Sequence, residues 1–449
     1  MALDMEAVKA RTNFADIWRR ILRYSKEGWE SISEEDVHLL KWHGVFLRKP
    51  TPGYFMIRVR VPGGILEQGK LSAVQLRALA EITKRFGRDV MDLTTRQQVQ
   101  LRWIKIEDVP QVLEMLKGVG LTTLQTGYDN IRNVTTCPVA GLTQDEVMDT
   151  RPLVRELNDA FVGNWKYANL PRKFNIAICG CRDNCAHAEM NDIGFTLAEK
   201  NGIRGFHVWV GGGQGSWGAQ HAWPMNLFIL PEQLVETALK ILDVFIEHGN
   251  RKKRTKARLK FLIEQWGIER FREEVLNRLS FPVIEAGKEL TREHSHRDHI
   301  GIHPQKEAGM YYIGLNVTTG RLQLSQAFEL ARLAEKYGTG ELRLTTGQNV
   351  IIPNLPEKKL DSFKAEPLLQ EVSYEPEPFQ RGLIACTGNT YCPFALIETK
   401  DRMRELVAYL DDKIGSDVLR ELGVFHIHAS GCPNSCGHPH TGQIGLIGK

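Results

Sequence analysis

The chain has 449 residues, of which 42% are hydrophobic and 25% charged, and 58 Lys and Arg residues against 54 Asp and Glu give a net charge of +4. The length predicts two to four domains, and the composition excludes disorder, collagen-like repeats and coiled coil. So small a charge argues against nucleic acid as the main partner. Residues 1–18 lack the apolar core of a secretory signal, and no stretch approaches about 18 uncharged apolar residues. We therefore expect a soluble, cytoplasmic protein without a membrane span.

The first 50 residues are rich in charge and predict a helical extension. Strand and helix patterns then alternate. In chain order we expect a strand, an amphipathic helix, a second strand and a second helix, over residues 54–61, 71–86, 93–99 and 109–116. The same order returns after residue 309, with a strand, a helix and a strand over residues 310–317, 324–337 and 344–350.

Two cysteine motifs also match between the halves. Gly180-Cys181-Arg182-Asp183-Asn184-Cys185-Ala186-His187 aligns with Gly431-Cys432-Pro433-Asn434-Ser435-Cys436-Gly437-His438. Cys185 and Cys436 are 251 positions apart, and so are Thr95 and Thr346. An ordered series of matches at nearly one offset indicates an internal duplication.

The segment between the two copies is basic at residues 251–258 and runs on to Pro282. We interpret it as a solvated linker helix, with a docking surface for an acidic partner as the alternative. Further on, His294-Ser295-His296-Arg297-Asp298-His299 fits the spacing of binuclear zinc hydrolases, but no apolar strand leads into it, and we expect a surface loop. Gly211-Gly212-Gly213 lacks the apolar helix of a dinucleotide site and would instead let the backbone approach a flat cofactor.

Eight cysteines are too few for a disulfide scaffold in a chain of this length, and they fall into two groups. The second group, Cys386-x5-Cys392 and Cys432-x3-Cys436, offers four thiolates in two close pairs. Such a set suits a tetrahedral zinc ion or a [4Fe–4S] cluster, and the x5 spacing fits structural zinc poorly. We favour the iron–sulfur cluster, with zinc and unligated core cysteines as alternatives.

The first group of cysteines is incomplete at the matching positions. Three matches are found: Cys181 with Cys432, Cys185 with Cys436, and Cys137 with Cys392. The counterpart of Cys386 falls near Ile131, which cannot ligate a metal. We therefore interpret this group, with the adjacent Cys179, as the relic of a symmetric ancestor rather than as a second cluster.

Cations gather at strand and turn positions of the first repeat: Arg58, Arg60, Arg96, Arg102, Arg132, Arg172 and Lys173. At three matching positions the second repeat has the uncharged residues Gly314, Asn316 and Gly347. This asymmetry predicts an anion site between the halves, with ligand chemistry in one half and the metal cluster in the other. Arginine forks also suit a cofactor with many carboxylates. The alternative is a set of surface arginines on exposed strand faces.

Together these motifs resemble the siroheme-dependent nitrite and sulfite reductase family, from about residue 42 to residue 449. The resemblance rests on Thr94-Thr95-Arg96-Gln97, Asp129-Asn130-Ile131-Arg132-Asn133, Leu170-Pro171-Arg172-Lys173-Phe174-Asn175, Cys386-Thr387-Gly388-x3-Cys392 and Gly431-Cys432-Pro433-Asn434-Ser435-Cys436. It implies a [4Fe–4S] cluster on Cys386, Cys392, Cys432 and Cys436, with Cys436 also bridging to the siroheme iron. It further implies that Arg58, Arg132, Lys173 and Asn175 form the catalytic site, and that Arg96, Arg172 and Asn434 help to bind the cofactors.

One position bears on the substrate. Sulfite reductases of this family usually have Lys-x-Lys where nitrite reductases have Lys-x-Asn, and this chain has Lys173-Phe174-Asn175. The resemblance therefore implies an assimilatory nitrite reductase that takes nitrite to ammonium with six electrons. No flavin or NAD(P)H domain is evident, so ferredoxin is the expected donor. Sulfite reductase is the alternative, a precorrin-modifying oxygenase is a more distant one, and a siroheme-free iron–sulfur carrier or an inactive assembly subunit would belong to another class.

The fold we expect is α+β, with pseudo-twofold duplicated ferredoxin-like units and two α/β siroheme-binding modules. The first repeat is expected to have a helical extension (1–50), a ferredoxin-like half-domain (51–120) and a siroheme and substrate module (121–250). A linker (251–306) then leads to a second half-domain (307–372) and an iron–sulfur module (373–449). The second repeat stops about fifty residues before the pattern of the first. We therefore expect it to be truncated. The resemblance implies a monomer.

Overall fold

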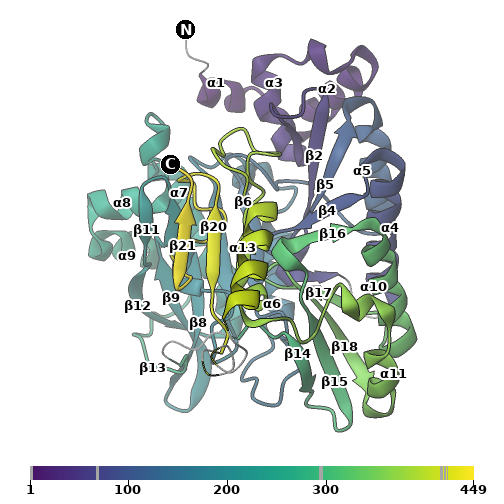
Figure 1. Cartoon of the computed structure of the whole chain (residues 1–449). Helices are drawn as coiled ribbons and strands as arrows, with labels where there is room; N and C mark the ends of the chain where they lie inside the picture. The colour runs from purple at the N-terminus through teal and green to yellow at the C-terminus, as the bar shows by residue number, and fades with distance from the viewer. Residues whose placement is uncertain (1–3, 67–69, 293–296, 415–417, 419–420, 422) are drawn as a thin grey trace.

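The computed structural model describes residues 4–66, 70–292, 297–414, 418, 421 and 423–449. Helices and sheets are mixed along the chain, which confirms the predicted α+β class (Figure 1). Within these residues, every helix is too short or too polar to traverse a lipid bilayer.

The first part of the chain is helical, with α1 (Met5–Ala10), α2 (Phe14–Glu27) and α3 (Glu34–Leu39). The side chains of Asp4, Asn13 and Ser33 accept hydrogen bonds from first-turn N–H groups and cap these helices. The extension then ends in a strand, because β1 (Val45–Leu47) pairs with β2 (Tyr54–Val59) and joins the first sheet. A three-residue strand is too short to show a period in the sequence.

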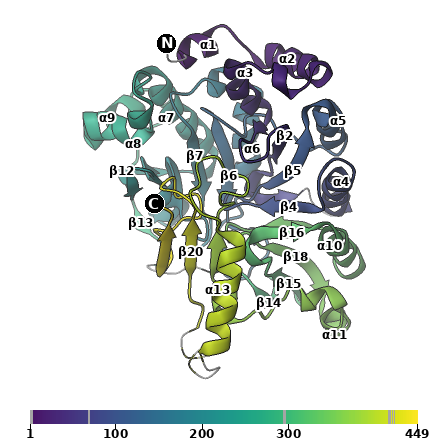
Figure 2. The ribbon, with the colours of Figure 1, turned by 45° about the horizontal axis from the view of Figure 1, so that its top comes forward.

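Two five-stranded sheets form the ferredoxin-like halves, and each takes its last strand from the other repeat. The first has the order β1-β2-β5-β4-β16, with β5, β4 and β16 at Val99–Lys105, Val90–Leu93 and Arg321–Gln323. The second has the order β14-β15-β18-β17-β3, at Gly301–Pro304, Met310–Leu315, Val350–Pro356, Leu342–Leu344 and Ile65–Leu66. Helices α4 (Lys70–Phe86) and α10 (Leu324–Tyr337) pack side by side on them, next to α5 (Val109–Gly118) (Figure 2). The exchanged strands place both repeats in one hydrophobic core.

The stretches 93–99 and 344–350, predicted as strands, are mostly tight turns between strands. The prediction was wrong because the β-branched Thr and Val residues of these stretches imitate a strand, whereas Gln97 and Gln348 adopt left-handed φ angles of 54° and 65°. The amide of Gln97 donates a hydrogen bond to the carbonyl of Leu344, and Gln348 makes the matching bond in return, each over 3.0 Å. This reciprocal pair confirms the duplication.

A six-stranded sheet forms the larger module of the first repeat. Its main order is β12-β9-β8-β7-β6, at Trp223–Ile229, Ile203–Val210, Ile193–Lys200, Phe174–Ile178 and Ile131–Thr136, and β13 (Lys288–Glu289) pairs with β8. A two-stranded ribbon, β10 (Gly213–Gly215) and β11 (Gly218–Gln220), follows β9. Helices α6 (Arg151–Phe161), α7 (Leu234–His248), α8 (Leu259–Trp266) and α9 (Ile268–Leu276) share its core.

The basic segment 251–258 is not the solvated helix that we predicted. Three of its arginines form ion pairs with other parts of the chain: Arg251 with Glu6, Arg254 with Asp129, and Arg258 with Asp192. The helices that follow pack into the core of the first repeat. Charge density alone could not reveal these distant partners. Lys252, Lys253 and Lys256 are exposed, so a docking surface for an acidic partner remains a prediction.

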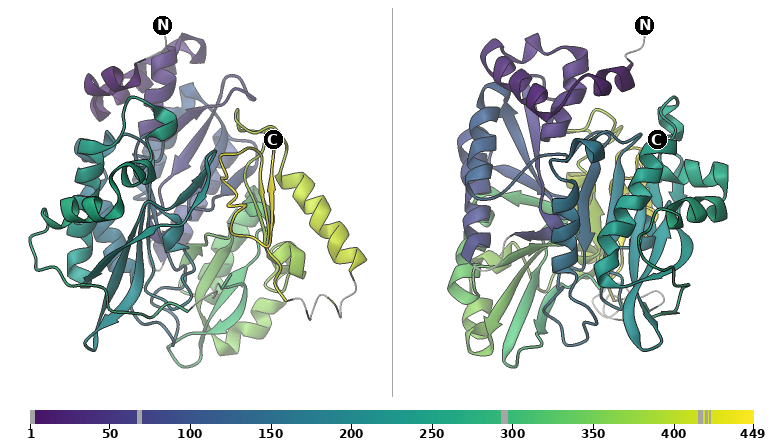
Figure 3. Two further views of the ribbon diagram at one scale, coloured as in Figure 1. Left: turned by 90° about the vertical axis from the view of Figure 1, so that its left-hand side faces the viewer. Right: turned by 180° about the vertical axis from the view of Figure 1, so that it is seen from behind.

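The corresponding module of the second repeat is smaller. Its three parallel strands have the order β19-β20-β21, at Leu383–Ala385, Ile427–Ser430 and Ile444–Ile447. Helix α13 (Lys400–Lys413) packs against α12 (Pro378–Arg381) and β19. This yellow sheet lies beside the larger sheet, with α13 on its outer side (Figure 3).

Glu366 stabilises the second half-domain in a pH-dependent way. Hydrogen bonds from Arg332, and also from Lys336 and Tyr337, lower the pKa of Glu366 to about 2 in spite of its burial. Because this pKa is depressed, the stabilisation is present above the ordinary value of 4.5 and is lost as the pH falls towards 2. Glu366→Gln should cost about 1–2 kcal/mol at pH 7, since its cationic partners are partly solvated. Thermal unfolding should show a lower midpoint at pH 7 and a shrinking difference below pH 4.5.

Asp361→Asn is the control for this prediction. Asp361 is fully exposed and lies 3.7 Å from Lys364, so its replacement should leave the unfolding midpoint unchanged at both pH values. Equal effects of the two substitutions would contradict the role given to Glu366.

Candidate functional site

Four of the predicted cations meet between the two modules, although they come from distant parts of the chain. Arg58 lies in β2, Arg96 in the turn before β5, Arg132 in β6, and Lys173 just before β7. The guanidinium groups of Arg58 and Arg132 both donate to the carbonyl of Thr126, each over 3.1 Å. These four cations thus lie close together, and their role in a shared site stays a prediction.

These cations repel one another at close range. Burial, and then Arg132, Arg48 and Arg96, lower the pKa of Arg58 well below its usual range. Burial and Arg96 lower the pKa of Arg132 to about 9, and burial followed by Arg96 lowers that of Lys173 strongly. The ion pairs found among the described residues include none of these four predicted cations. Half-buried cations without carboxylate partners form a site for an anion.

Two other predicted cations do not belong to this site. The guanidinium group of Arg60 is buried and donates to four backbone carbonyls, those of Leu124, Gln125, Ile131 and Arg132. Arg102 is bound to Asp92 and Gln100. Both arginines therefore hold the fold together, which corrects their assignment to the anion site. Spacing along a strand could not reveal this, because it does not show where a long side chain ends.

Arg172 and Arg48 lie near the edge of the site. Arg172 is 3.7 Å from Asp129, a buried carboxylate that also pairs with Arg254. Arg48, which the sequence analysis missed, shares the ring of Phe46 with Arg58: their guanidinium carbons lie 5.3 Å and 4.7 Å from the ring centre. Arg48 directly follows β1, a strand that the sequence analysis did not predict, so its place near the other cations could not be recognised from the sequence.

A cavity lies between the loops of the two repeats, next to these cations. Its lining includes Thr95, Arg96, Asn175, His187, Gln214, Thr346, Ser435 and His438. The side-chain oxygens of Asn175 and Gln214 are buried and have no hydrogen-bond partner among the described residues. Buried polar atoms of this kind are available to a ligand or to water. Gln214 follows the glycine run that we expected to admit a flat cofactor.

Two histidines of the cavity were aligned in the sequence but given no role. His187 and His438 are 251 positions apart and share left-handed φ angles of 48° and 54°. Burial lowers the pKa of His187 to about 4 and that of His438 well below its usual value, so both rings are neutral at pH 7. Their repetition in both motifs was the signal that could have identified them.

The four cysteines of the second repeat lie in two adjoining loops. Cys386 and Cys392 follow β19, and Cys432 and Cys436 lie between β20 and β21. The N–H of Gly431 donates to the sulfur of Cys386 over 3.1 Å. Burial, and then the charge of Cys436, raise the pKa of Cys386, and Cys436 and Cys392 are also close enough to act on Cys432.

The spacing of these sulfurs fits an iron–sulfur cluster better than a single ion. Among the described residues, no three of them lie within 4.8 Å of one another. A [4Fe–4S] cluster binds each thiolate through a different iron and therefore needs a wider set than one ion does. Asn434, the remaining predicted residue, is exposed and its side chain hydrogen-bonds to Cys432. The carbonyl of Cys436 accepts a hydrogen bond from Thr95 over 3.2 Å, which places this cysteine beside the cations.

The structure corrects the alignment of the first cysteine group. Cys137 directly follows β6 as Cys386 directly follows β19, and both strands run parallel, in the same register, to the strand that leads to Cys181 or Cys432. Cys137 is therefore the counterpart of Cys386, not of Cys392. The sequence comparison failed because the loops after these strands differ, whereas strand pairing fixes the correspondence.

The chain is similar to known proteins in sequence and in fold. Residues 127–283 match the sequence model of the nitrite and sulphite reductase 4Fe-4S domain, and residues 47–119 and 303–369 match that of the nitrite/sulfite reductase ferredoxin-like half domain. The chain belongs to the nitrite and sulfite reductase family. This confirms the resemblance stated from the sequence, and the family implies both predicted cofactors, siroheme and a [4Fe–4S] cluster.

Relatives within the family cover nearly the whole chain. The ferredoxin–nitrite reductase of Synechococcus elongatus is 45% identical, over 99% of this chain and 86% of that protein. The assimilatory ferredoxin-dependent nitrite reductase of Haloferax mediterranei is 38% identical, over 95% of this chain and 76% of that protein. Among solved structures, the NirA protein of Mycobacterium tuberculosis superposes with a TM-score of 0.90 at 32% identity, over 97% of this chain and 82% of that one.

Proposed function

We propose that this protein reduces nitrite to ammonium with six electrons from reduced ferredoxin. The observation that carries the proposal is the group of half-buried cations without carboxylate partners beside Cys436, at a cavity between the two repeats. The overall reaction consumes one nitrite, six electrons and eight protons, and yields one ammonium ion and two waters. The names of the relatives, ferredoxin–nitrite reductase among them, support the substrate and the donor.

The cofactors would be held by residues of both repeats. Cys386, Cys392, Cys432 and Cys436 would bind the [4Fe–4S] cluster, with Asn434 supporting the loop. Arg96 and Arg172 would neutralise the carboxylates of siroheme, and Cys436 would be shared between the two groups. When bound, siroheme and the cluster supply a site for the nitrogen of nitrite and a path for single electrons.

The cations would bind and protonate the substrate. Arg58 and Arg132 share a carbonyl acceptor and so present fixed donors to an oxyanion. They would stabilise the charge that develops on oxygen as the N–O bonds break. Because burial lowers its pKa strongly, Lys173 gives up a proton more readily than an ordinary lysine and is suited to proton delivery.

Asn175 is expected to favour nitrite over sulfite. Asn175→Lys would add a cation beside Arg96 in the cavity, which matches the dianion sulfite better than the monoanion nitrite. We expect kcat/KM for sulfite relative to nitrite to rise about tenfold. Ser216→Lys adds the same charge at an exposed position between β10 and β11 and should leave the ratio unchanged. If the ratio of kcat/KM for sulfite to that for nitrite were unchanged in Asn175→Lys, Asn175 would not determine the substrate preference.

The function is tested on anaerobically purified protein. Siroheme gives strong Soret and red absorption bands, and reduced ferredoxin should be consumed at six equivalents for each ammonium formed. Sulfide formed from sulfite at a higher kcat/KM would favour sulfite reductase instead. Iron–sulfur absorption without siroheme bands, even after reconstitution, would favour an electron carrier and contradict the proposal.

A further inference from the structure

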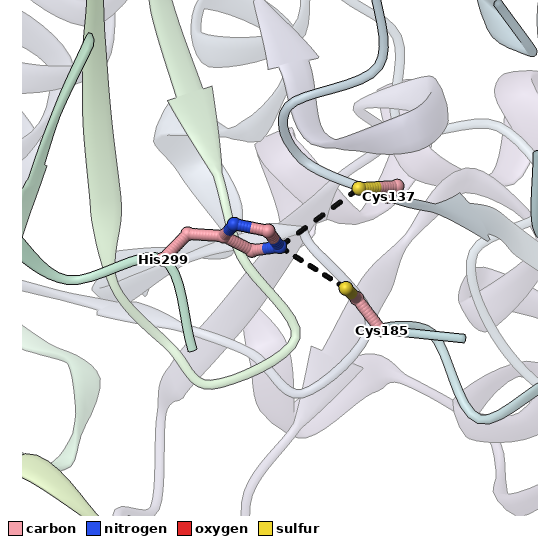
Figure 4. Close-up of side chains that lie close together, drawn as sticks. All are labelled: Cys137, Cys185 and His299. Atoms are coloured by element: carbon pink, nitrogen blue, oxygen red, sulfur yellow. Dashed lines mark hydrogen bonds between the residues drawn. The ribbon is translucent and has the colours of Figure 1, made fainter. Parts of the chain in front are cut away.

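The first-repeat cysteines meet a histidine from the segment between the repeats. The sulfur of Cys185 lies 3.0 Å from Nε2 of His299, and the sulfur of Cys137 lies 3.9 Å from the same nitrogen. Figure 4 shows the ring edge of His299 directed at both sulfurs. The sulfur of Cys181 lies 3.9 Å from that of Cys185 and also interacts with Cys137. Three side chains that can ligate a metal thus converge, and Cys181 adjoins them through its contacts with Cys185 and Cys137.

These three side chains are buried, and a neighbouring residue holds the histidine ring in place. Cys137, Cys185 and His299 are all buried, and the group of three ligand atoms lies within 4.8 Å. The hydroxyl of Tyr312 lies 3.4 Å from Nδ1 of His299, so this contact leaves Nε2 directed at the sulfurs. A second contact that fixes the far ring nitrogen is the usual companion of a metal-ligating histidine.

The loops that present these sulfurs are fixed from the second repeat. Thr346 donates a hydrogen bond to the carbonyl of Cys185 over 3.1 Å, which mirrors the bond from Thr95 to Cys436. The buried guanidinium of Arg343 donates to the carbonyls of Pro138 and Ala140, just after Cys137. Its charge is paired with the buried carboxylate of Glu341 over 2.6 Å, so Arg343 fixes the loop after Cys137 chiefly through these hydrogen bonds.

We propose that Cys137, Cys181, Cys185 and His299 bind one zinc ion. Three thiolates and one imidazole form a frequent ligand set of structural zinc, and bond lengths near 2.0–2.3 Å place such ligands about 3.5–3.8 Å apart. Three separations lie near this range: 3.0 Å for Cys185 with His299, and 3.9 Å both for Cys137 with His299 and for Cys181 with Cys185. Cys181 lies outside the group of three ligand atoms that are all within 4.8 Å, so it would have to close on the ion when zinc binds. A cubane cluster would need the wider spacing seen among the cysteines of the second repeat.

This site revises two interpretations made from the sequence. The first cysteine group is not an inert relic, because His299 supplies the ligand that the second repeat takes from Cys392. His299 was also expected in a surface loop, but it is buried. His294 and His296 lie outside the described residues. A zinc ion here would tie the segment between the repeats to the loop whose Ala186 and His187 line the cavity.

Metal analysis of the full chain tests the proposal, independently of nitrite reduction. Protein without a histidine tag, purified anaerobically, should contain about one zinc per chain in addition to its iron. Cys185→Ser and His299→Ala should each lower the zinc content at least about tenfold and leave the iron content unchanged. Cys179→Ala changes a buried cysteine outside the group and should retain the zinc.

Cobalt provides a second measurement on the unchanged protein. Co²⁺ exchanged for zinc should give thiolate charge-transfer absorption and the visible bands of a tetrahedral site, and zinc should displace it. The proposal is overturned if the wild-type protein binds neither ion after reduction and reconstitution. It is also overturned if both variants keep their zinc, or if Cys185→Ser instead loses iron, which would indicate a second cluster.

Discussion

Replacing Cys436 by serine is expected to abolish nitrite reduction. This side chain is exposed, so the substitution leaves the hydrophobic core intact, yet it removes the thiolate assigned to both cofactors. Activity should fall to background with reduced ferredoxin and with a chemical reductant alike, and the absorption bands of the bound cofactors should be lost or displaced. Steady-state rates, iron content and the absorption spectrum measure the effect.

His440→Ala is the matched control for Cys436→Ser. His440 lies in the same loop, is also exposed, and contacts only the hydroxyl of Ser435 among the hydrogen bonds found for the described residues. Its replacement should leave activity and spectrum unchanged. If Cys436→Ser kept full activity and an unchanged spectrum, the assignment of Cys436 would be wrong.

Replacing Asp92 by asparagine should lower the free energy of unfolding more than any other substitution considered for this protein. Asp92 in β4 is buried and forms ion pairs with Arg102, Arg321 and Lys400, whose side chains are at most 9% exposed. Asparagine has the same shape but would leave the buried Arg102 and Lys400 without an acidic partner among the described residues, and Arg321 with only Asp401 at 3.7 Å. Breaking a buried ion pair in this way costs about 3–5 kcal/mol. Thermal unfolding of Asp92→Asn should therefore show a much lower midpoint than that of the wild type. Asp412→Asn is the control: Asp412 pairs with Lys413 at an exposed position, so its replacement should leave the midpoint unchanged.

The pH dependence of this site has a definite sign. Burial alone would raise the pKa of Asp92, but Lys400, Arg102 and Arg321 together hold it well below its usual range. The folded state therefore gains its stabilisation above the ordinary value of 3.8 and loses it only in stronger acid. The difference between wild type and Asp92→Asn should be constant from pH 5 to 7. A difference that disappeared within that range would contradict this account.

Asp92 also shows how the repeats are held together. Its partners come from β5, from β16 of the other repeat and from the start of α13. Arg102 donates in addition to the hydroxyl of Thr387, next to Cys386. One buried carboxylate thus links the exchanged strands to the loop that carries the cluster cysteines.

Residue identity and spacing determined much of this protein by themselves. The duplication, the two cysteine motifs and the excess of cations in one repeat are properties of the chain read in order, and they led to the family and its cofactors. The predicted helices near residues 71–86, 109–116 and 324–337 agree with α4, α5 and α10, because an amphipathic face leaves a period in the sequence.

Other features were decided only by the tertiary structure. Exchanged edge strands, the internal pairing of Arg60 and Arg102, and the meeting of Cys137 with His299 depend on contacts between residues far apart in the chain. No period or spacing encodes such contacts, because a side chain's partner is set by where the folded backbone brings it. The sequence therefore identified the chemistry of the site, while the fold determined which cations remain available to an anion and which cysteines share a histidine.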